Sequence, residues 1–482
     1  MTLFLTPIRP VLKGLSVAIV ALACFRSPLY AQSLNHDDTT INADNATIER
    51  GHYLAIAADC AACHTAPNGG KAYAGGYGIA SPFGPIFSTN ITPSKRYGIG
   101  LYTFKEFKHA LREGIRADGA HLYPAMPYTS YTKLSDNDIL ALYAYFMLKV
   151  QSVDVAAPTT KLPFPFNIRM SMIGWNLLFL DNTRFKPDPT QSNEVNKGHY
   201  LAIALAHCDT CHTPRNALMA ERGSMALSGA SLSSWYAPNI TSDPKSGIGT
   251  WSNDELVTYL KTGDLPGKSQ AGGPMAEAIE HSFQHLSDAD LKAIATYIKQ
   301  FPAYANPGVQ AARDTYGKKS NEEASVRGLA LNTRNHGEEL FSAECAACHR
   351  PTGEGSPDHY YPQLFHNTAL GAPYPDNLIT TILMGIRRTV NGHTVYMPGF
   401  GKGSFVDSLS DQDIADIANY VEQQFGNPAV IIKAEDVHII RTGGPKPLLA
   451  QIGPYIAPAM IFGLVIVISL GIIVLKRIQR KK

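Results

Sequence analysis

The chain has 482 residues, of which 45% are hydrophobic and 17% are charged. This length exceeds that of one ordinary core and indicates about three domains, and the composition excludes an intrinsically disordered protein. Residues 1–31 and 476–482 contain eight basic and no acidic residues, which leaves 34 of the 42 basic residues against 40 acidic ones in between. This acidic excess argues against nucleic acid as a partner.

The first 31 residues predict a secretory signal peptide. A basic start precedes an apolar stretch at residues 15–24, which is too short to span a bilayer. Cleavage is expected after Ala31. Lipidation at Cys24 is the alternative, because a small residue precedes this cysteine.

A five-residue motif, Cys-x-x-Cys-His, occurs three times and accounts for six of the seven cysteines. This is the signature of c-type haem attachment, in which both thiols add to haem vinyl groups and the histidine binds the iron. The predicted attachment residues are Cys60, Cys63, Cys208, Cys211, Cys345 and Cys348, and the predicted proximal ligands are His64, His212 and His349. The sequence therefore predicts three covalently bound haem c groups and electron transfer as the function.

Two other kinds of site use paired cysteines. A zinc ribbon needs four ligands around one tetrahedron, but these pairs lie about 140 residues apart. A thioredoxin-like dithiol needs one reactive pair on a βαβ unit. Neither alternative explains a histidine directly after the second cysteine in every copy.

The motifs divide the chain into three modules, at residues 32–150, 194–301 and 335–427. The first two are internal repeats, because Gly-His-Tyr-Leu-Ala-Ile-Ala precedes the motif in both and Asn-Ile-Thr follows it in both. The third module is more divergent.

Each module is predicted to end with a helix that begins at a Ser-Asp-x-Asp sequence resembling a capping box. This pattern looks like the c-type cytochrome fold, in which an N-terminal helix with a small residue and an aromatic crosses the C-terminal helix. The pairs expected there are Gly51 with Tyr53, Gly198 with Tyr200, and Gly337 with Phe341. The predicted fold class is mostly α, with three tandem c-type cytochrome domains and one C-terminal transmembrane helix.

Two linkers separate the modules. Residues 151–193 are too apolar for a free linker and are expected to pack over the modules, with a docking surface for a partner or membrane as the alternative. Residues 302–334 are polar and are expected to form a flexible tether.

The C-terminal region predicts a membrane anchor. After a juxtamembrane segment at 428–455, residues 456–475 carry no charge and would span about 30 Å as a helix with Pro458 in its first turn. The basic tail at 476–482 should stay on the cytoplasmic side, which places the haem domains in the periplasm and the anchor in the inner membrane. A buried core helix is the alternative.

The second axial ligand of each haem is predicted to be methionine, which gives a closed electron carrier with a raised potential. Met126 and Met275 lie 62 and 63 residues after the histidines of their own motifs, and Met397 lies 48 residues after its histidine. Met384 is the rival in the third module, but core packing within a helix is the preferred explanation for it.

Arginines are weaker candidates for pairing with haem propionates, since a guanidinium fork suits a carboxylate. A solvated helix face is an equal alternative. These residues are Arg112, Arg116, Arg387 and Arg388.

Several parts of the sequence point to one known family: the three motifs, Arg50-Gly51-His52-Tyr53, Asn90-Ile91-Thr92-Pro93, the segment 273–281 and the basic C-terminus. Together they resemble the cytochrome c subunit of membrane-bound dehydrogenases of acetic acid bacteria. The resemblance covers nearly the whole chain and is closest to the fructose, gluconate and sorbitol dehydrogenase branch. The alcohol dehydrogenase subunit is a more distant relative.

This resemblance implies a relay without catalytic residues of its own. Electrons would come from a separate catalytic subunit, expected to contain FAD and to be accompanied by a small subunit, and would pass to ubiquinone in the membrane. The absence of a Gly-x-Gly-x-x-Gly dinucleotide motif agrees with this division. The alternatives are a multihaem peroxidase or reductase with an open haem, and a cytochrome c subunit of a terminal oxidase.

Overall fold

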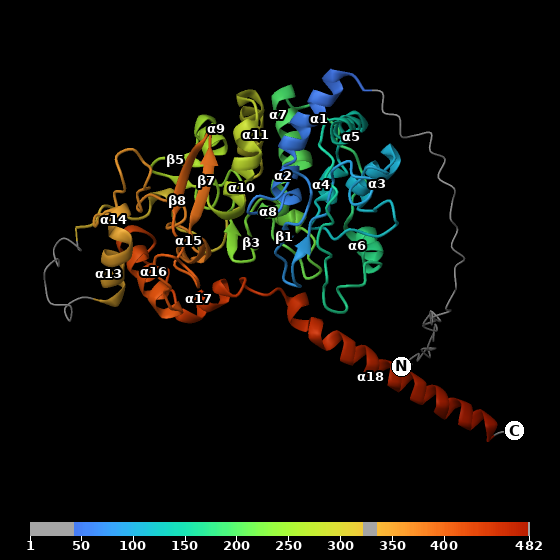
Figure 1. Ribbon diagram of the computed structural model, residues 1–482. Helices are drawn as coiled ribbons and strands as arrows, with labels where there is room; N and C mark the ends of the chain where they lie inside the picture. The colour runs from blue at the N-terminus through green and yellow to red at the C-terminus, as the bar shows by residue number, and fades with distance from the viewer. Residues whose placement is uncertain (1–42, 322–334, 481–482) are drawn as a thin grey trace, which may run out of the picture. The chain divides into compact units, whose positions relative to one another are not determined.

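The computed structural model describes residues 43–321 and 335–480, which all fall within one compact unit of the chain. The described part is mostly helical and contains four antiparallel sheets of two strands each (Figure 1). The predicted signal peptide, including Ala31 and Cys24, lies outside the described residues.

The elements follow the predicted three-module organisation. Module 1 contains α1 (Asn45–Ala57), α2 (Cys60–His64), β1 (Gly78–Ile79), β2 (Ile86–Phe87), α3 (Phe104–Glu113), α4 (Tyr128–Tyr131) and α5 (Asp136–Leu148), and α6 (Ser171–Phe179) follows in the first linker. Module 2 contains α7 (Asn193–His199), η2 (Tyr200–Leu205), α8 (Cys208–His212), η3 (Gly223–Met225), β3 (Ala230–Leu232), β4 (Trp235–Ala237), α9 (Asn253–Thr262), β5 (Asp264–Leu265), β6 (Ser269–Gln270), α10 (Gly273–His281), η4 (Phe283–His285) and α11 (Asp288–Gln300). After η5 (Arg313–Thr315), module 3 contains α13 (His336–Leu340), η7 (Phe341–Cys345), α14 (Ala346–His349), α15 (Asp376–Met384), β7 (Ile386–Val390), β8 (His393–Met397) and α16 (Asp411–Phe425), and α17 (Ala434–Arg441) and α18 (Leu448–Gln479) complete the chain.

The first and last helices of each module cross at a glycine, as the sequence predicts. A Cβ atom added at Gly51 or Gly198 would lie 1.9 Å from a carbonyl oxygen of α5 or α11, and one at Gly337 would lie 2.2 Å from a carbonyl oxygen of α16. Only glycine therefore permits these backbones to approach so closely. In module 3, Phe341 is fully buried and its ring lies 5.2 Å from that of Tyr420, as expected at such a crossing.

Tyr53 and Tyr200 do not take the corresponding place in modules 1 and 2, and the prediction for them is wrong. Each tyrosine instead reaches the other module. The Tyr200 hydroxyl donates to Oδ2 of Asp138 at 2.5 Å, and the Tyr53 hydroxyl donates to Oδ2 of Asp290 at the same distance. The rings that stack on the closing-helix tyrosines are those of His52, 4.9 Å from Tyr145, and His199, 4.6 Å from Tyr297.

The closing helices begin as predicted, with a serine side chain that accepts from the backbone N–H three residues later. These bonds measure 3.1 Å at Ser135, 3.2 Å at Ser287 and 3.1 Å at Ser410. The reciprocal bond that completes a capping box is present at Ser410 but not at the other two serines. Asp138 and Asp290 are engaged by the tyrosines of the neighbouring module instead.

Two hydrophobic cores result from this packing. Modules 1 and 2 share one core, which contains both crossing helix pairs, and module 3 has a core of its own. The first two modules are therefore one structural pair built from a repeat, and module 3 is a separate packing unit joined to it.

The first linker packs over module 1, as expected, through Asn176 of α6, which accepts from the Tyr128 hydroxyl at 2.8 Å. The outer face of α6 remains apolar, with Leu177 86% exposed. The second linker differs from the predicted tether over its described part, residues 302–321. There Arg313 is buried, and the side chain of Asn306 donates to the Ser228 carbonyl at 3.1 Å. Residues 322–334 lie outside the described ones.

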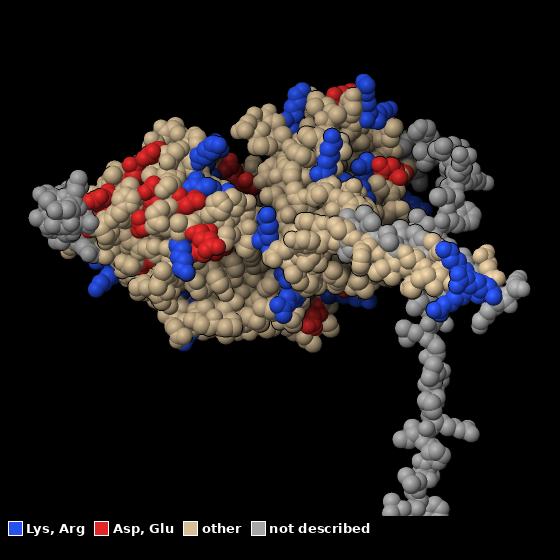
Figure 2. All heavy atoms as spheres, turned by 90° about the horizontal axis from the view of Figure 1, so that it is seen from below, with Lys and Arg blue, Asp and Glu red and all other residues tan. Residues whose placement is uncertain are grey.

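The predicted membrane span lies within α18, which begins at Leu448 rather than near residue 456. Pro458, expected in the first turn, therefore lies inside the helix. A search of the residues that the structure describes finds no helix with the length and apolar character needed to cross a membrane. Many side chains between 457 and 478 are not among those described. Basic side chains gather at the end of α18, where Lys476, Arg477 and Arg480 are exposed (Figure 2).

Candidate haem sites

Each Cys-x-x-Cys-His motif lies directly after the first helical segment of its module. In modules 1 and 2 the residue before the first cysteine has a left-handed backbone, with φ of 52° at Asp59 and 40° at His207. This residue turns the chain from the first helix into the motif helix. Residues three apart share one helix face, so both cysteines of a motif face the same side. All six motif cysteines are half-buried, and none forms a disulfide.

The motif histidines are anchored in the same way in all three modules. Nδ1 lies 2.7 Å from the Thr89 carbonyl oxygen for His64, 2.6 Å from that of Pro238 for His212, and 3.0 Å from that of Pro362 for His349. Because a carbonyl can only accept, Nδ1 carries the proton and Nε2 keeps its lone pair for a metal. This geometry is the one that a proximal haem ligand requires.

The local environment keeps these groups neutral. Burial lowers the pKa of His212 to about 4, despite the opposing effect of its hydrogen bond to Pro238. Burial also raises the pKa of the Cys60 thiol to about 12. A neutral imidazole suits iron, whereas thiols that resist ionisation are poor candidates for a free thiolate centre.

The two alternatives for the cysteine pairs fail on geometry. Among the described residues, no three Cys, His, Asp or Glu side chains converge on a position that could hold a metal ion, as a zinc ribbon would require. The described sheets are two-stranded and antiparallel, so they do not supply the βαβ unit of a thioredoxin-like dithiol. Paired thiols with a histidine anchored through Nδ1 fit covalent haem instead.

The three predicted axial methionines are all half-buried at the edge of a core. Met126 lies just before α4, Met275 lies in the first turn of α10, and Met397 ends β8. The β7–β8 hairpin places Met397 opposite Ile386. These positions fit thioether ligands, and the pairing of each methionine with a haem iron remains a prediction.

Met384 differs from its expected role. It is the last residue of α15 and is 56% exposed, so core packing does not explain it. Because Met397 packs against the core of module 3 and Met384 does not, Met397 remains the preferred candidate.

The first two motifs face each other across the module pair. Helix α10, which carries Met275, contacts α2 of module 1, and the Tyr77 hydroxyl donates to Glu277 of α10 at 3.4 Å. In the other direction, the Ser130 hydroxyl of α4 lies 3.4 Å from Oδ1 of Asp209 in α8. Burial raises the pKa of Cys63 to about 12, with smaller contributions from nearby acidic groups and from Cys211. The pairing therefore brings the first two haem attachment points close together.

Two of the four arginines considered for haem propionates have other partners. Arg112 pairs with Asp136 at 2.6 Å, and Arg116 pairs with Asp118 at 2.8 Å. Arg112 also lines a cationic cavity of about 370 Å³ in module 1, together with Lys105, Lys108, His109, Glu113 and Arg184. Of the other two, Arg387 is exposed and Arg388 is buried.

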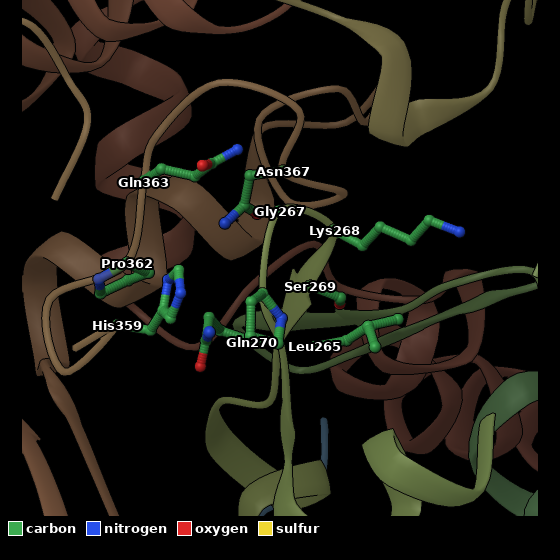
Figure 3. Close-up of a pocket in the computed structure, with 10 residues that line it drawn as sticks. Leu265, Gly267, Lys268, Ser269, Gln270, His359, Pro362, Gln363 and Asn367 are labelled. Carbon is green, nitrogen blue, oxygen red and sulfur yellow. The ribbon is translucent and has the colours of Figure 1, made fainter. Parts of the chain in front are cut away.

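Modules 2 and 3 meet at the β5–β6 hairpin. The labelled side chains in Figure 3 come from this hairpin and from the module 3 loop that contains Pro362, the residue that anchors His349. The cavity between them holds only about 10 Å³, close to the space that one water molecule needs. It is too small for a quinone or a sugar.

Comparison with known proteins agrees with this geometry. The sequence model of the cytochrome c family matches residues 48–148, 195–302 and 335–425. The chain is 48% identical to the fructose dehydrogenase cytochrome subunit of Gluconobacter japonicus, over 86% of this chain and 87% of that protein. It is 37% identical to the cytochrome c subunit of the quinone-type alcohol dehydrogenase of Gluconacetobacter polyoxogenes, over 84% and 86%, and 36% identical to the gluconate 2-dehydrogenase cytochrome c subunit of Pantoea cypripedii, over 83% and 90%.

Three tandem modules with anchored proximal histidines define a multihaem electron carrier. The chain belongs to the cytochrome c family, in the group of dehydrogenase cytochrome subunits. It contains three covalently bound haem c groups and transfers electrons, as the sequence predicts.

Sequence reasoning missed the residues that position the histidines. Asn90 and Asn239 directly follow the carbonyls that anchor His64 and His212, and each asparagine accepts from a backbone N–H two residues later, at 2.9 and 2.8 Å. Their side-chain amides also donate to the carbonyls of Val153 and Tyr304, in the linker that follows each module. The repeated Asn-Ile-Thr sequence was the available signal, because identical triplets at matched positions indicated a shared structural task.

Proposed function

We propose that this chain is the electron-transfer subunit of a membrane-bound sugar or polyol dehydrogenase complex. The observation that carries the proposal is its 48% identity to a fructose dehydrogenase cytochrome subunit, sustained over 86% of the chain. Identity to the gluconate 2-dehydrogenase subunit is lower, at 36%, so fructose is the preferred substrate of the partner. The catalytic partner is proposed to contain FAD and to be accompanied by a small subunit.

In this proposal the haem irons supply one-electron chemistry, and the chain sets how easily each accepts an electron. His64, His212 and His349 would bind the haem irons through Nε2, and Met126, Met275 and Met397 would each supply a thioether as the second protein ligand. Thioether ligation closes the coordination sphere and raises the potential, which suits a relay rather than an enzyme with an open haem.

The C-terminus is proposed to anchor the complex. The support comes from the complete sequence of residues 456–475, which has no charged residue, and from the basic tail at 476–482. After removal of residues 1–31, this anchor would leave the haem modules in the periplasm and the tail in the cytoplasm. Ubiquinone in the inner membrane is the proposed electron acceptor.

The function can be tested on the complex purified from membranes through a tag on this chain. We expect a flavin-containing dehydrogenase subunit to co-purify with the chain. Addition of D-fructose should reduce the c-type haems within the mixing time, whereas gluconate and ethanol should not reduce them. Ubiquinone should reoxidise the haems. The proposal fails if dithionite reduces all three haems while no sugar or polyol does. Fast stoichiometric binding of carbon monoxide to one haem would indicate an open iron, and co-purification with a haem–copper oxidase would favour an oxidase subunit.

The predicted methionine ligand of the module 3 haem can be tested with Met397→Leu. Loss of the thioether should lower the midpoint potential of one haem by on the order of 0.1 V, a fraction of the ~0.8 V range that axial ligands span. Covalent haem content should remain three per chain, because the attachment cysteines are unchanged. Met384→Leu is the matched control, since this methionine is 56% exposed. A spectroelectrochemical titration of both variants decides between the two methionines: a shift in Met384→Leu alone would reverse the assignment.

A further inference from the structure

Two buried arginines lie beside the haem site of module 2 without an acidic partner. Arg313, from η5 in the second linker, is 9% exposed, and Arg388, from β7 of module 3, is 2% exposed. Arg313 donates through Nη2 to the Asn239 carbonyl at 3.2 Å, and its Nε has no partner. Arg388 donates to the Ala271 carbonyl at 2.7 Å and to Oε1 of Gln270 at 3.3 Å. Among the described residues neither guanidinium group forms an ion pair with an acidic side chain, although Asp314 lies next to Arg313 in the chain and favours its charged form.

The position of Arg313 ties it to the haem ligand. It is bonded to the carbonyl of the residue that follows Pro238, and the Pro238 carbonyl anchors His212. Arg313 therefore binds the carbonyl next to the one that anchors the proximal histidine.

The position of Arg388 brings it to the same side of module 2. Burial raises the pKa of Tyr259 in α9, and the charges of Arg388 and Arg313 both oppose this effect. Tyr259 therefore lies near both arginines. Asp264 and Glu280 also influence Arg388, but they are engaged elsewhere, by the side-chain amide of Gln270 and by the Thr389 backbone N–H.

Arg388 reaches module 2 from the β7–β8 hairpin of module 3. Strand β7 contacts α10, with a 2.9 Å hydrogen bond from the Thr389 N–H to Oε2 of Glu280. A Cβ atom at Gly263, the residue that ends α9, would lie 2.7 Å from Cδ of Arg388. The matching glycine of module 1, Gly114, faces the Tyr128 ring at the same distance. The space that an aromatic of the same module fills in module 1 is thus filled in module 2 by an arginine from module 3.

A buried charge without a partner is costly, by several kcal/mol in real proteins, so buried guanidinium groups normally meet an anion. The haem attached at Cys208 and Cys211 carries two propionate carboxylates, and a guanidinium fork is the usual partner of a carboxylate. We infer that Arg313 and Arg388 bind the propionates of the module 2 haem, so that the second linker and module 3 complete the haem site of module 2. Module 3 then helps to set the potential of a haem that it does not attach.

Arg388→Gln in the full-length, haem-loaded chain tests this inference. A positive charge near the propionates favours the reduced haem, so its loss should shift the reduction equilibrium of one haem at least tenfold toward the oxidised form, about 59 mV for a one-electron couple. Haem content should stay at three per chain. Arg387→Gln is the matched control, because its side chain is exposed on the same strand. Midpoint potentials from a spectroelectrochemical titration are the readout, and a purely structural role would leave them unchanged.

Two further variants locate the effect. Arg313→Gln should shift the same titration step as Arg388→Gln, although the two residues come from different segments. Arg388→Lys keeps the positive charge but loses the two-pronged guanidinium geometry, so its shift in midpoint potential should be smaller than that of Arg388→Gln. If Arg388→Gln does not accumulate, Arg388→Lys takes its place in the test. The inference is wrong if all three potentials of the Arg388 variants equal those of the unchanged chain. It is also wrong if the two glutamine variants shift different steps, or if Arg387→Gln produces the same shift.

Discussion

Replacement of Gly198 by alanine is expected to destabilise the three-haem protein by about 2 kcal/mol or more. The added Cβ would lie 1.9 Å from the Ala293 carbonyl oxygen and 2.5 Å from its carbon, which are backbone atoms of α11 and cannot rotate away. The higher helix propensity of alanine would by itself stabilise the folded chain by about 1 kcal/mol. Separation of α7 from α11 in a shared core should cost about 3 kcal/mol or more, the upper end of overpacking effects. The clash therefore outweighs the propensity gain.

Gly174→Ala provides the matched control for this prediction. Gly174 also lies inside a helix, α6, but its added Cβ would meet no heavy atom within 4 Å. At this position only the higher helix propensity of alanine acts. The variant should therefore be as stable as the unchanged chain or more stable, by up to about 1 kcal/mol. Haem content per chain and denaturant midpoints followed by haem absorbance measure both variants. Equal stability of the two would show that the α7–α11 crossing tolerates a side chain.

The parts of the fold that depend on local chemistry could be predicted from the sequence. The serine caps at 135, 287 and 410 follow from hydrogen bonding within four residues, and the crossing glycines follow from the repeat around each motif. The haem attachment residues follow from the motif itself. Each of these features is complete within one module.

The parts that depend on contacts between modules could not be predicted. Tyr53 and Tyr200 look like crossing aromatics when each module is considered alone, but their hydroxyls serve the neighbouring module. Arg387 and Arg388 look alike in sequence, and strand alternation shows only that one points inward. The residue that Arg388 meets, Ala271, lies 117 positions away in another module. No local pattern encodes such a pairing.

Loss of the two tyrosine hydroxyls together, in Tyr53→Phe/Tyr200→Phe, is expected to loosen the module pair. Each hydroxyl donates to a buried aspartate and accepts from the backbone N–H of a helix-capping serine, at 3.1 Å from Ser135 N for Tyr200 and from Ser287 N for Tyr53. These bonds are part-buried or exposed and the aspartates keep other partners, so their loss should cost about 0.5–1.5 kcal/mol at each site. Arg50 and Lys197 still pair with the aspartates, so the modules themselves should remain folded.

Comparison of the two single variants with the double variant tests whether the reciprocal bonds act as one interface. Both bonds span the same module pair, so after the first is lost the second should contribute less, and the two effects should not add. The unfolding free energy from denaturant titration gives this coupling, with Tyr374→Phe, a 42% exposed tyrosine, as control. Strict additivity would mean that each bond stabilises only its own helix end. A coupled loss should also slow electron exchange between the first two haems, because both attachment sites belong to this module pair, in which α10 contacts α2.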